Sequence, residues 1–210
     1  MNTDRATVFV IDDDESVRRG LARLLSAEGW NVETFPRARD FLEHDTHSGA
    51  GCVVLDVRMP EISGPELQSR MRELGLSLPI IFLTGHGDVP TSVQAMKRGA
   101  ADFLLKPVDS AELLRTVAEA MERHAAELER QEERRHVRAC LAQLTARERE
   151  VLECVIRGHR NKQIAAELGI SEKTVKVHRG RVMQKMGVRS VAELVHLCET
   201  VDITVVSPRV

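Results

Sequence analysis

The sequence predicts an α/β fold, with a doubly wound five-stranded parallel sheet, joined by a long helix to an all-α domain of four helices. Five short apolar runs recur at regular intervals in the first half, and helical patterns separate them. Apolar strands that alternate with helices are typical of a parallel sheet covered on both faces. The second half carries helix signals only, which predicts a separate helical domain.

The predicted strands are residues 7–12, 31–35, 52–56, 79–84 and 102–106. Residues 15–29 place four apolar side chains at helical spacing and stop at Gly29. Segments 64–75 and 89–99 also read as helices that end at a glycine. The strand and helix signals therefore alternate along the whole first half.

A single long helix is predicted to leave the first domain, because residues 110–144 contain neither Pro nor Gly. Its apolar stripe weakens at 129–135, which is almost wholly charged. A solvated connector and a coiled-coil dimer seam are equally compatible with this pattern. The apolar positions before the break are Leu114, Val117, Met121, His124 and Leu128.

Four helices follow, over residues 144–158, 161–169, 171–187 and 190–201. Capping-box spacing marks the first and last of them, and Asn161 and Ser171 are the predicted caps of the middle two. The middle pair, joined by "GIS", has the pattern of a helix-turn-helix. The predicted organisation is a first domain over 1–122, a helical linker over 123–143, a second domain over 144–200 and a tail over 201–210.

Charge is distributed unevenly although the net charge is only −2. Residues 1–122 hold 13 Lys and Arg against 20 Asp and Glu, whereas residues 145–199 hold 11 against 7. An acidic first half and a basic second half suggest different partners. The four cysteines have no disulfide or zinc spacing. With no apolar stretch of 18 residues and no signal segment, the chain is expected to be cytoplasmic.

Polar residues stand at the ends of the predicted strands. Because the carboxyl ends of parallel strands meet at one sheet edge, these side chains are expected to converge. A carboxylate cluster suits Mg²⁺, and a carboxylate beside a lysine can accept a phosphoryl group as an aspartyl phosphate. The converging residues are Asp12, Asp13, Asp56, Thr84 and Lys106.

Residues 6 to about 122 resemble a receiver domain of two-component response regulators, which has a flavodoxin-like fold. The matching motifs are "VIDDDESVR", "VVLDVRMPEISG", "IIFLTGHGD" and "ADFLLKP". The resemblance implies that Asp56 is the phosphoacceptor, and it assigns no role to Asp14, the third consecutive acid. It also implies a divalent-cation site of Asp12, Asp13, Asp56 and the backbone carbonyl of Arg58, with Thr84, Lys106 and Phe103 completing the switch.

Residues 144 to about 200 resemble the LuxR-type helix-turn-helix of the FixJ and NarL families, through "LTAREREVL" and "NKQIAAELGISEKTVKVHRGRVMQKMGVRS". The order of the two domains and the long linker are most similar to StyR-type regulators of the FixJ subgroup. In a helix-turn-helix the second helix enters the major groove. Gly180 departs from the family pattern, in which a polar or basic residue is frequent. The expected DNA contacts are Lys176 and Val177 to bases, and Lys173, Thr174, Arg179 and Arg181 to phosphates.

Together the two resemblances imply a DNA-binding response regulator rather than a dedicated enzyme. Its expected partners are a sensor histidine kinase, double-stranded promoter DNA and RNA polymerase, with a homodimer formed on phosphorylation. The dimer would bind half-sites about 10 bp apart, and activation of transcription is the expected effect. Two other classes are a small phosphatase or phosphotransferase that uses the same aspartate, and a protein whose second domain binds protein instead of DNA.

Overall fold

The computed structural model describes residues 6–44, 49–85 and 100–201. The chain divides into two compact units, residues 1–128 and 129–210, and this division falls inside the predicted linker. The predicted helix over 89–99 lies outside the described residues. The elements of the first unit are β1 (Thr7–Ile11), α1 (Glu15–Ala27), β2 (Asn31–Phe35), α2 (Ala38–Leu42), β3 (Gly51–Asp56), α3 (Gly64–Glu73), β4 (Ile80–Thr84) and β5 (Asp102–Leu105), followed by α5 (Ser110–Ala142).

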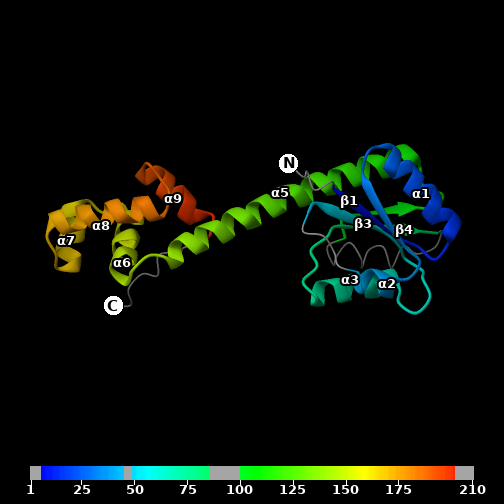
Figure 1. Ribbon diagram of the computed structural model, residues 1–210, viewed down its shortest axis with the longest axis horizontal. Coiled ribbons are helices and arrows are strands. Elements are labelled where there is room, and N and C mark those ends of the chain that lie inside the picture. Colours follow the sequence, from blue (N-terminus) through cyan, green and yellow to red (C-terminus); the bar gives the residue numbers. More distant parts are fainter. Residues whose placement is uncertain (1–5, 45–48, 86–99, 202–210) are drawn as a thin grey trace. The chain divides into compact units, whose positions relative to one another are not determined.

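The five strands form one parallel sheet in the order β2-β1-β3-β4-β5, which confirms the predicted fold class. Alternate residues of each strand face opposite sides. Phe9 and Ile11 belong to a core with Leu67 and Met71 of α3. On the other side of the sheet, the alternate residues of β1 pack against α1 and α5. This second core includes Val8 and Val10 of β1, Leu21 and Leu25 of α1, and Leu113 and Val117 of α5. Figure 1 shows the two helix layers on either side of the sheet.

Two details of the first unit were not predicted. The short helix α2 has only five residues, Ala38–Leu42, too few to display a helical period in the sequence. His124 of α5 is buried, and its Nδ1 accepts a hydrogen bond of 3.0 Å from the amide of Gly51 at the start of β3. Burial lowers the pKa of His124, so the neutral ring that accepts this bond is favoured.

The long helix α5 is continuous over Ser110–Ala142, as predicted. Its first part contributes Val117 and Met121 to the core of the first unit, and its last part contributes Val137 and Cys140 to the core of the second. All residues from 125 to 136 are described, and none of them is buried. The middle of α5, residues 125–136, therefore contributes no buried side chain to the core of either unit.

The second unit contains the four predicted helices, α6 (Ala146–Ile156), α7 (Asn161–Leu168), α8 (Glu172–Lys185) and α9 (Val191–Glu199). Three of the predicted caps are confirmed: Thr145, Ser171 and Ser190 precede α6, α8 and α9 and accept amide hydrogen bonds. The cap predicted for α7 was wrong. Arg160 is the N-cap, and its amide donates to Gln163 Oε1 at 2.8 Å, whereas Asn161 is already helical.

Glu148 of α6 is nearly buried, with 2% of its surface exposed. Its Oε2 accepts hydrogen bonds from Lys185 Nζ of α8 at 2.6 Å and from the Thr145 amide at 2.9 Å. The bond from Lys185, then that from Thr145, lowers the pKa of Glu148 to about 2 from an ordinary 4.5. One carboxylate thus caps α6 and ties it to α8.

We expect this carboxylate to stabilise the second unit fully above pH 4.5, its ordinary pKa. A lowered pKa means that the unfolded chain takes up the proton first, so the contribution is lost as the pH falls towards about 2. Calorimetry of wild type and Glu148→Gln should give a difference in melting temperature that shrinks over that pH window. Glu150→Gln, at an exposed ion pair with Arg147, is the control. A difference independent of pH would contradict the assignment.

Candidate functional site

Four strand ends of the first unit place polar side chains at one edge of the sheet. Asp12 follows β1, Asp56 ends β3, Thr84 ends β4 and Lys106 follows β5. The strands are parallel, so these residues share the carboxyl edge. The strand order reverses between β1 and β3, and such switch points are where open α/β sheets bind ligands.

Lys106 lies between the two buried carboxylates of this edge. Its Nζ is 2.6 Å from Asp12 Oδ2 and 3.2 Å from Asp56 Oδ2. Asp12, Asp13 and Asp56 each offer one carboxylate oxygen within 4.8 Å of the others. Asp12 is buried and Asp13 is exposed, so the cluster opens to solvent on the Asp13 side.

The electrostatics of the cluster reflect a competition between burial and ion pairing. Burial raises the pKa of Asp56, the charge of Lys106 opposes this, and the charge of Asp12 adds to it. Burial lowers the pKa of Lys106, but its hydrogen bond to Asp12 and the charges of both carboxylates outweigh burial, so the net direction is upward. Lys106 is therefore held as a cation beside Asp56.

The turn after β3 approaches the strand closely. The Arg58 amide donates to Asp56 Oδ1 at 3.4 Å, and the Gly64 amide donates to the Val57 carbonyl at 3.0 Å. A Cβ atom at Gly64 would lie 2.6 Å from the carbonyl oxygen of Asp56 and 2.9 Å from the ring of Phe82. Only glycine fits where α3 begins against the strand that carries Asp56.

We expect Gly64→Ala to destabilise the first unit by about 1–3 kcal/mol, the usual cost of overpacking. Trp30 is the only tryptophan of the chain and lies in the first unit, so its fluorescence during urea unfolding reports this unit. Gly20→Ala is the control, because a Cβ at Gly20 meets no atom within 4 Å. An unchanged unfolding midpoint for Gly64→Ala would contradict this prediction, because it would show that the turn accommodates the Cβ atom with little loss of stability.

Thr84 and Phe103 occupy neighbouring strands next to the acidic cluster. Thr84 is buried, and its hydroxyl donates to the Gly85 carbonyl at 3.1 Å. Phe103 is half-buried and packs against Phe82, with ring centroids 5.9 Å apart. The rest of the loop that begins at Gly85 lies outside the described residues.

Asp14, the third consecutive acid, caps helix α1. Its Oδ1 accepts hydrogen bonds from the Ser16 amide at 2.7 Å and the Ser16 hydroxyl at 2.6 Å. These bonds lower the pKa of Asp14. The segment between β1 and α1 is also held by Arg18, whose guanidinium donates to the backbone carbonyl of Asp12 at 2.7 Å. An Asp just before a helix is a typical N-cap. Because Asp12, Asp13 and Asp14 are consecutive, the sequence did not show which of them caps α1.

In the second unit, α8 exposes one face and buries the other. Val175, Val182 and Met186 are in the core, whereas residues 172–174, 176, 177, 180, 181 and 184 are exposed. Val177 has 47% of its surface exposed, a large fraction for an apolar side chain. The predicted contact residues that are exposed are Lys173, Thr174, Lys176, Val177 and Arg181.

Two residues of α8 differ from the simple pattern. Arg179 is half-buried, and its guanidinium donates to Asn161 Oδ1 of α7 at 2.8 Å. This bond ties the two helices of the helix-turn-helix together. Gly180 is exposed, and a Cβ there would meet no atom within 4 Å. Packing within the unit therefore does not require glycine at this position.

Two family models match the chain. Residues 8–118 match the response regulator receiver domain, and residues 142–198 match the bacterial regulatory proteins of the luxR family. The chain belongs to the LuxR-type response regulators. The response regulator thus combines a receiver unit with a helix-turn-helix unit, and its relatives are transcriptional regulators of two-component systems.

Among curated relatives, "Nodulation protein W" of Bradyrhizobium diazoefficiens is 44% identical over 95% of this chain and 88% of its own length. "Transcriptional regulatory protein FixJ" of Azorhizobium caulinodans is 46% identical over 90% of each chain. "Response regulator protein TodT" of Pseudomonas putida is 43% identical over 94% of this chain and 87% of its own.

Two solved structures are similar over nearly the full length of the response regulator. That of the response regulator StyR has 49% identity and a TM-score of 0.85, and covers 93% of this chain and 98% of its own. Full-length FixJ of B. japonicum has 40% identity and a TM-score of 0.59, with 97% and 100% covered. Within residues 6–44, 49–85 and 100–201, no helix is both long and apolar enough to span a bilayer.

Proposed function

We propose that a sensor histidine kinase phosphorylates Asp56 and that this modification promotes dimerisation and binding of promoter DNA. The carrying observation is the placement of Asp56 beside Lys106, 3.2 Å away, within a cluster that includes Asp12 and Asp13. In the transfer, an Asp56 oxygen forms a bond to phosphorus while the bond from phosphorus to the donor nitrogen breaks. Lys106 favours the ionised Asp56 against burial and can pair with the phosphoryl oxygens.

A divalent cation such as Mg²⁺ fits the acidic cluster. Its donor set is hard oxygen, from Asp12, Asp13 and Asp56, whose ligand atoms lie within 4.8 Å of one another. The backbone carbonyl of Arg58 is the further proposed ligand. When bound, the cation neutralises charge on the phosphoryl group. The supporting bonds from Lys106 and from Arg18 to Asp12 orient this side of the site.

Phosphorylation adds roughly −1.5 to −2 charge, which favours inward movement of the Thr84 hydroxyl towards the new oxygens. The present bond of Thr84 to the Gly85 carbonyl is local and can be exchanged. Phe103 packs beside this site and would turn as the neighbouring space changes. The new charge need favour the second state by only a few kcal/mol to shift the population.

In the second unit, the exposed face of α8 supports binding in the major groove. We assign base contacts to Lys176 and Val177, and phosphate contacts to Lys173, Thr174 and Arg181. Arg179, tied to Asn161, would reach phosphate only by exchanging that bond. A dimer on promoter DNA, contact with RNA polymerase, activation of transcription and a cytoplasmic location complete the proposal.

The test is to incubate the full chain with acetyl phosphate and Mg²⁺, and to follow phosphoryl uptake by intact mass and dimerisation by light scattering. We expect stoichiometric uptake and a dimer for wild type. Thr84→Ala should still take up the phosphoryl group but form less dimer, because the acceptor is intact and the switch is not. Catalytic turnover of an added phosphomonoester would instead favour a phosphatase.

A further inference from the structure

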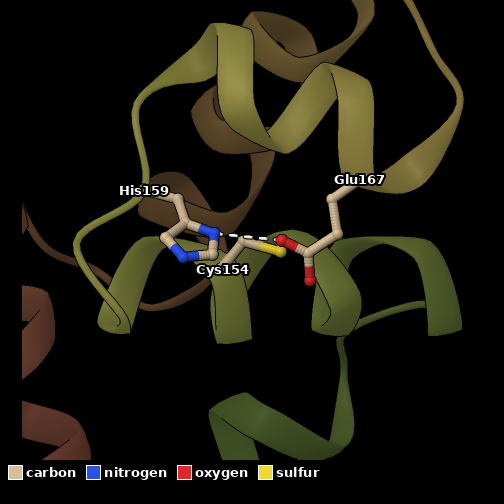
Figure 2. A group of neighbouring side chains, drawn as sticks. All are labelled: Cys154, His159 and Glu167. Carbon is tan, nitrogen blue, oxygen red and sulfur yellow. Dashed lines mark ion pairs between the residues drawn. The ribbon is translucent and has the colours of Figure 1, made fainter. Parts of the chain in front are cut away.

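Three side chains of the second unit bring three kinds of metal ligand to one point (Figure 2). Cys154 comes from α6, His159 from the turn after it, and Glu167 from the last turn of α7. Their ligand atoms, Sγ, a ring nitrogen and a carboxylate oxygen, lie within 4.8 Å of one another. Neither the receiver site nor the exposed face of α8 uses any of these residues.

The local geometry favours a ligand at this point. His159 Nδ1 is buried and lies 3.0 Å from Glu167 Oε2. Among the described residues it makes no hydrogen bond of acceptable geometry, so the buried ring nitrogen and the carboxylate oxygen meet without a well-formed bond. The side chains of His159 and Glu167 remain 30% and 38% exposed, which gives an ion a path from solvent.

A cation already occupies the neighbourhood of the cluster. The Arg157 guanidinium contacts Glu167 Oε1 at 2.5 Å and Cys154 Sγ at 3.2 Å. Its side chain is 27% exposed, so it can swing to solvent. The negative charge that attracts Arg157 is the charge that would attract a metal ion in its place.

We propose that Cys154, His159 and Glu167 bind a borderline divalent metal ion of the Zn²⁺ class, which replaces Arg157. A thiolate, an imidazole and a carboxylate form a three-ligand zinc set with an open fourth position. Bond lengths of about 2.0–2.3 Å put tetrahedral ligands roughly 3.3–3.6 Å apart. The His159 and Glu167 atoms, now 3.0 Å apart, would therefore separate a little, and any ligand pair near the 4.8 Å limit would need to approach by about 1 Å. The Cys154 thiol releases its proton to solvent on binding.

The ion would fasten the end of α6 to the end of α7. Helix α7 is in turn tied to α8 by the bond between Asn161 and Arg179, and Ile164 shares a core with Val175. Metal occupancy therefore sets the position of the helix that supports the DNA-contacting face. The effect on DNA affinity is a consequence of the site and is independent of Asp56.

The test is titration of the full, reduced chain with Co²⁺, whose thiolate complexes give a charge-transfer band in the near ultraviolet. In wild type we expect the band to reach its full intensity at one equivalent of Co²⁺ and to disappear when Zn²⁺ displaces Co²⁺. The band should be absent in Cys154→Ser. His159→Ala and Glu167→Gln should weaken Co²⁺ binding by about tenfold or more. Controls are Cys198→Ser, another buried thiol of the same core, and Glu153→Gln, an exposed carboxylate of α6; both should retain the band.

Arg157→Ala separates a metal site from a purely structural ion-pair network. If the guanidinium competes with the metal, this variant binds Co²⁺ more tightly than wild type. Circular dichroism checks that each variant is folded, and Glu167→Gln, which changes an exposed residue, tests the site if Cys154→Ser does not fold. The proposal is overturned if wild type shows no thiolate band at millimolar Co²⁺. A band that survives in Cys154→Ser would equally overturn it and would point to Cys140, whose Sγ lies 3.7 Å from His136.

Discussion

Asp56→Asn is expected to abolish phosphoryl uptake from acetyl phosphate and to make DNA binding indifferent to the donor. The amide is not a nucleophile for this transfer, and no other carboxylate of the cluster is placed in the same way. Asp12 is buried and bonded to Lys106 at 2.6 Å, and Asp13 is exposed at the solvent side. Intact mass and gel-shift titration, each with and without donor and Mg²⁺, measure the two effects.

The matched control is Asp14→Asn, a change of the same kind two residues from Asp12. Asparagine caps helices as well as aspartate does, so α1 should persist through the bonds now made to Ser16. We expect this variant to take up the phosphoryl group as wild type does. A donor response that survives in Asp56→Asn would show that the switch lies elsewhere.

The receiver site was predictable to a large extent because parallel strands fix where their ends meet. Asp12, Asp56 and Lys106 are 44 and 50 residues apart in sequence, yet the strand pattern places them at one edge, where the structure has them. Asp14 was not assignable, since the choice among three adjacent acids depends on the exact residue at which α1 begins. The rest of the loop after Gly85 lies outside the described residues.

The second unit shows the limits of sequence patterns more sharply. The N-cap of α7 lies one residue before the predicted position. Asn161 is a residue type that often caps helices, but its backbone is already helical, so Arg160 is the N-cap. Arg179 looked like a free phosphate contact, and only the packing of α7 on α8 brings it to Asn161. The sequence indicated no zinc site, and the cluster proposed above depends on Glu167, which meets Cys154 and His159 only through the fold.

Lys176→Ala is expected to weaken binding to the preferred site by about 1–3 kcal/mol, the usual worth of a base contact. Lys176 and its neighbour Val177 are both exposed on α8, whereas Val175 is buried in the core. The loss should fall mainly on the preferred sequence, so the ratio of specific to random affinity declines. Fluorescence anisotropy with both duplexes at fixed salt measures this ratio.

Lys173→Ala serves as the comparison, because Lys173 is assigned to phosphate. We expect it to weaken both duplexes by a similar factor and to reduce the slope of log affinity against log salt by about 1. The assignments would be reversed if Lys176→Ala lowered both affinities equally while Lys173→Ala changed sequence preference.

The most direct test of the account is selection from a randomised duplex pool by the full chain at fixed salt, with and without acetyl phosphate and Mg²⁺, alongside light scattering. The account predicts that the donor produces dimers and enriches a two-fold symmetric site with half-sites about 10 bp apart. Strong binding that is identical in both conditions would contradict it, because Asp56 would then not control the DNA-binding unit.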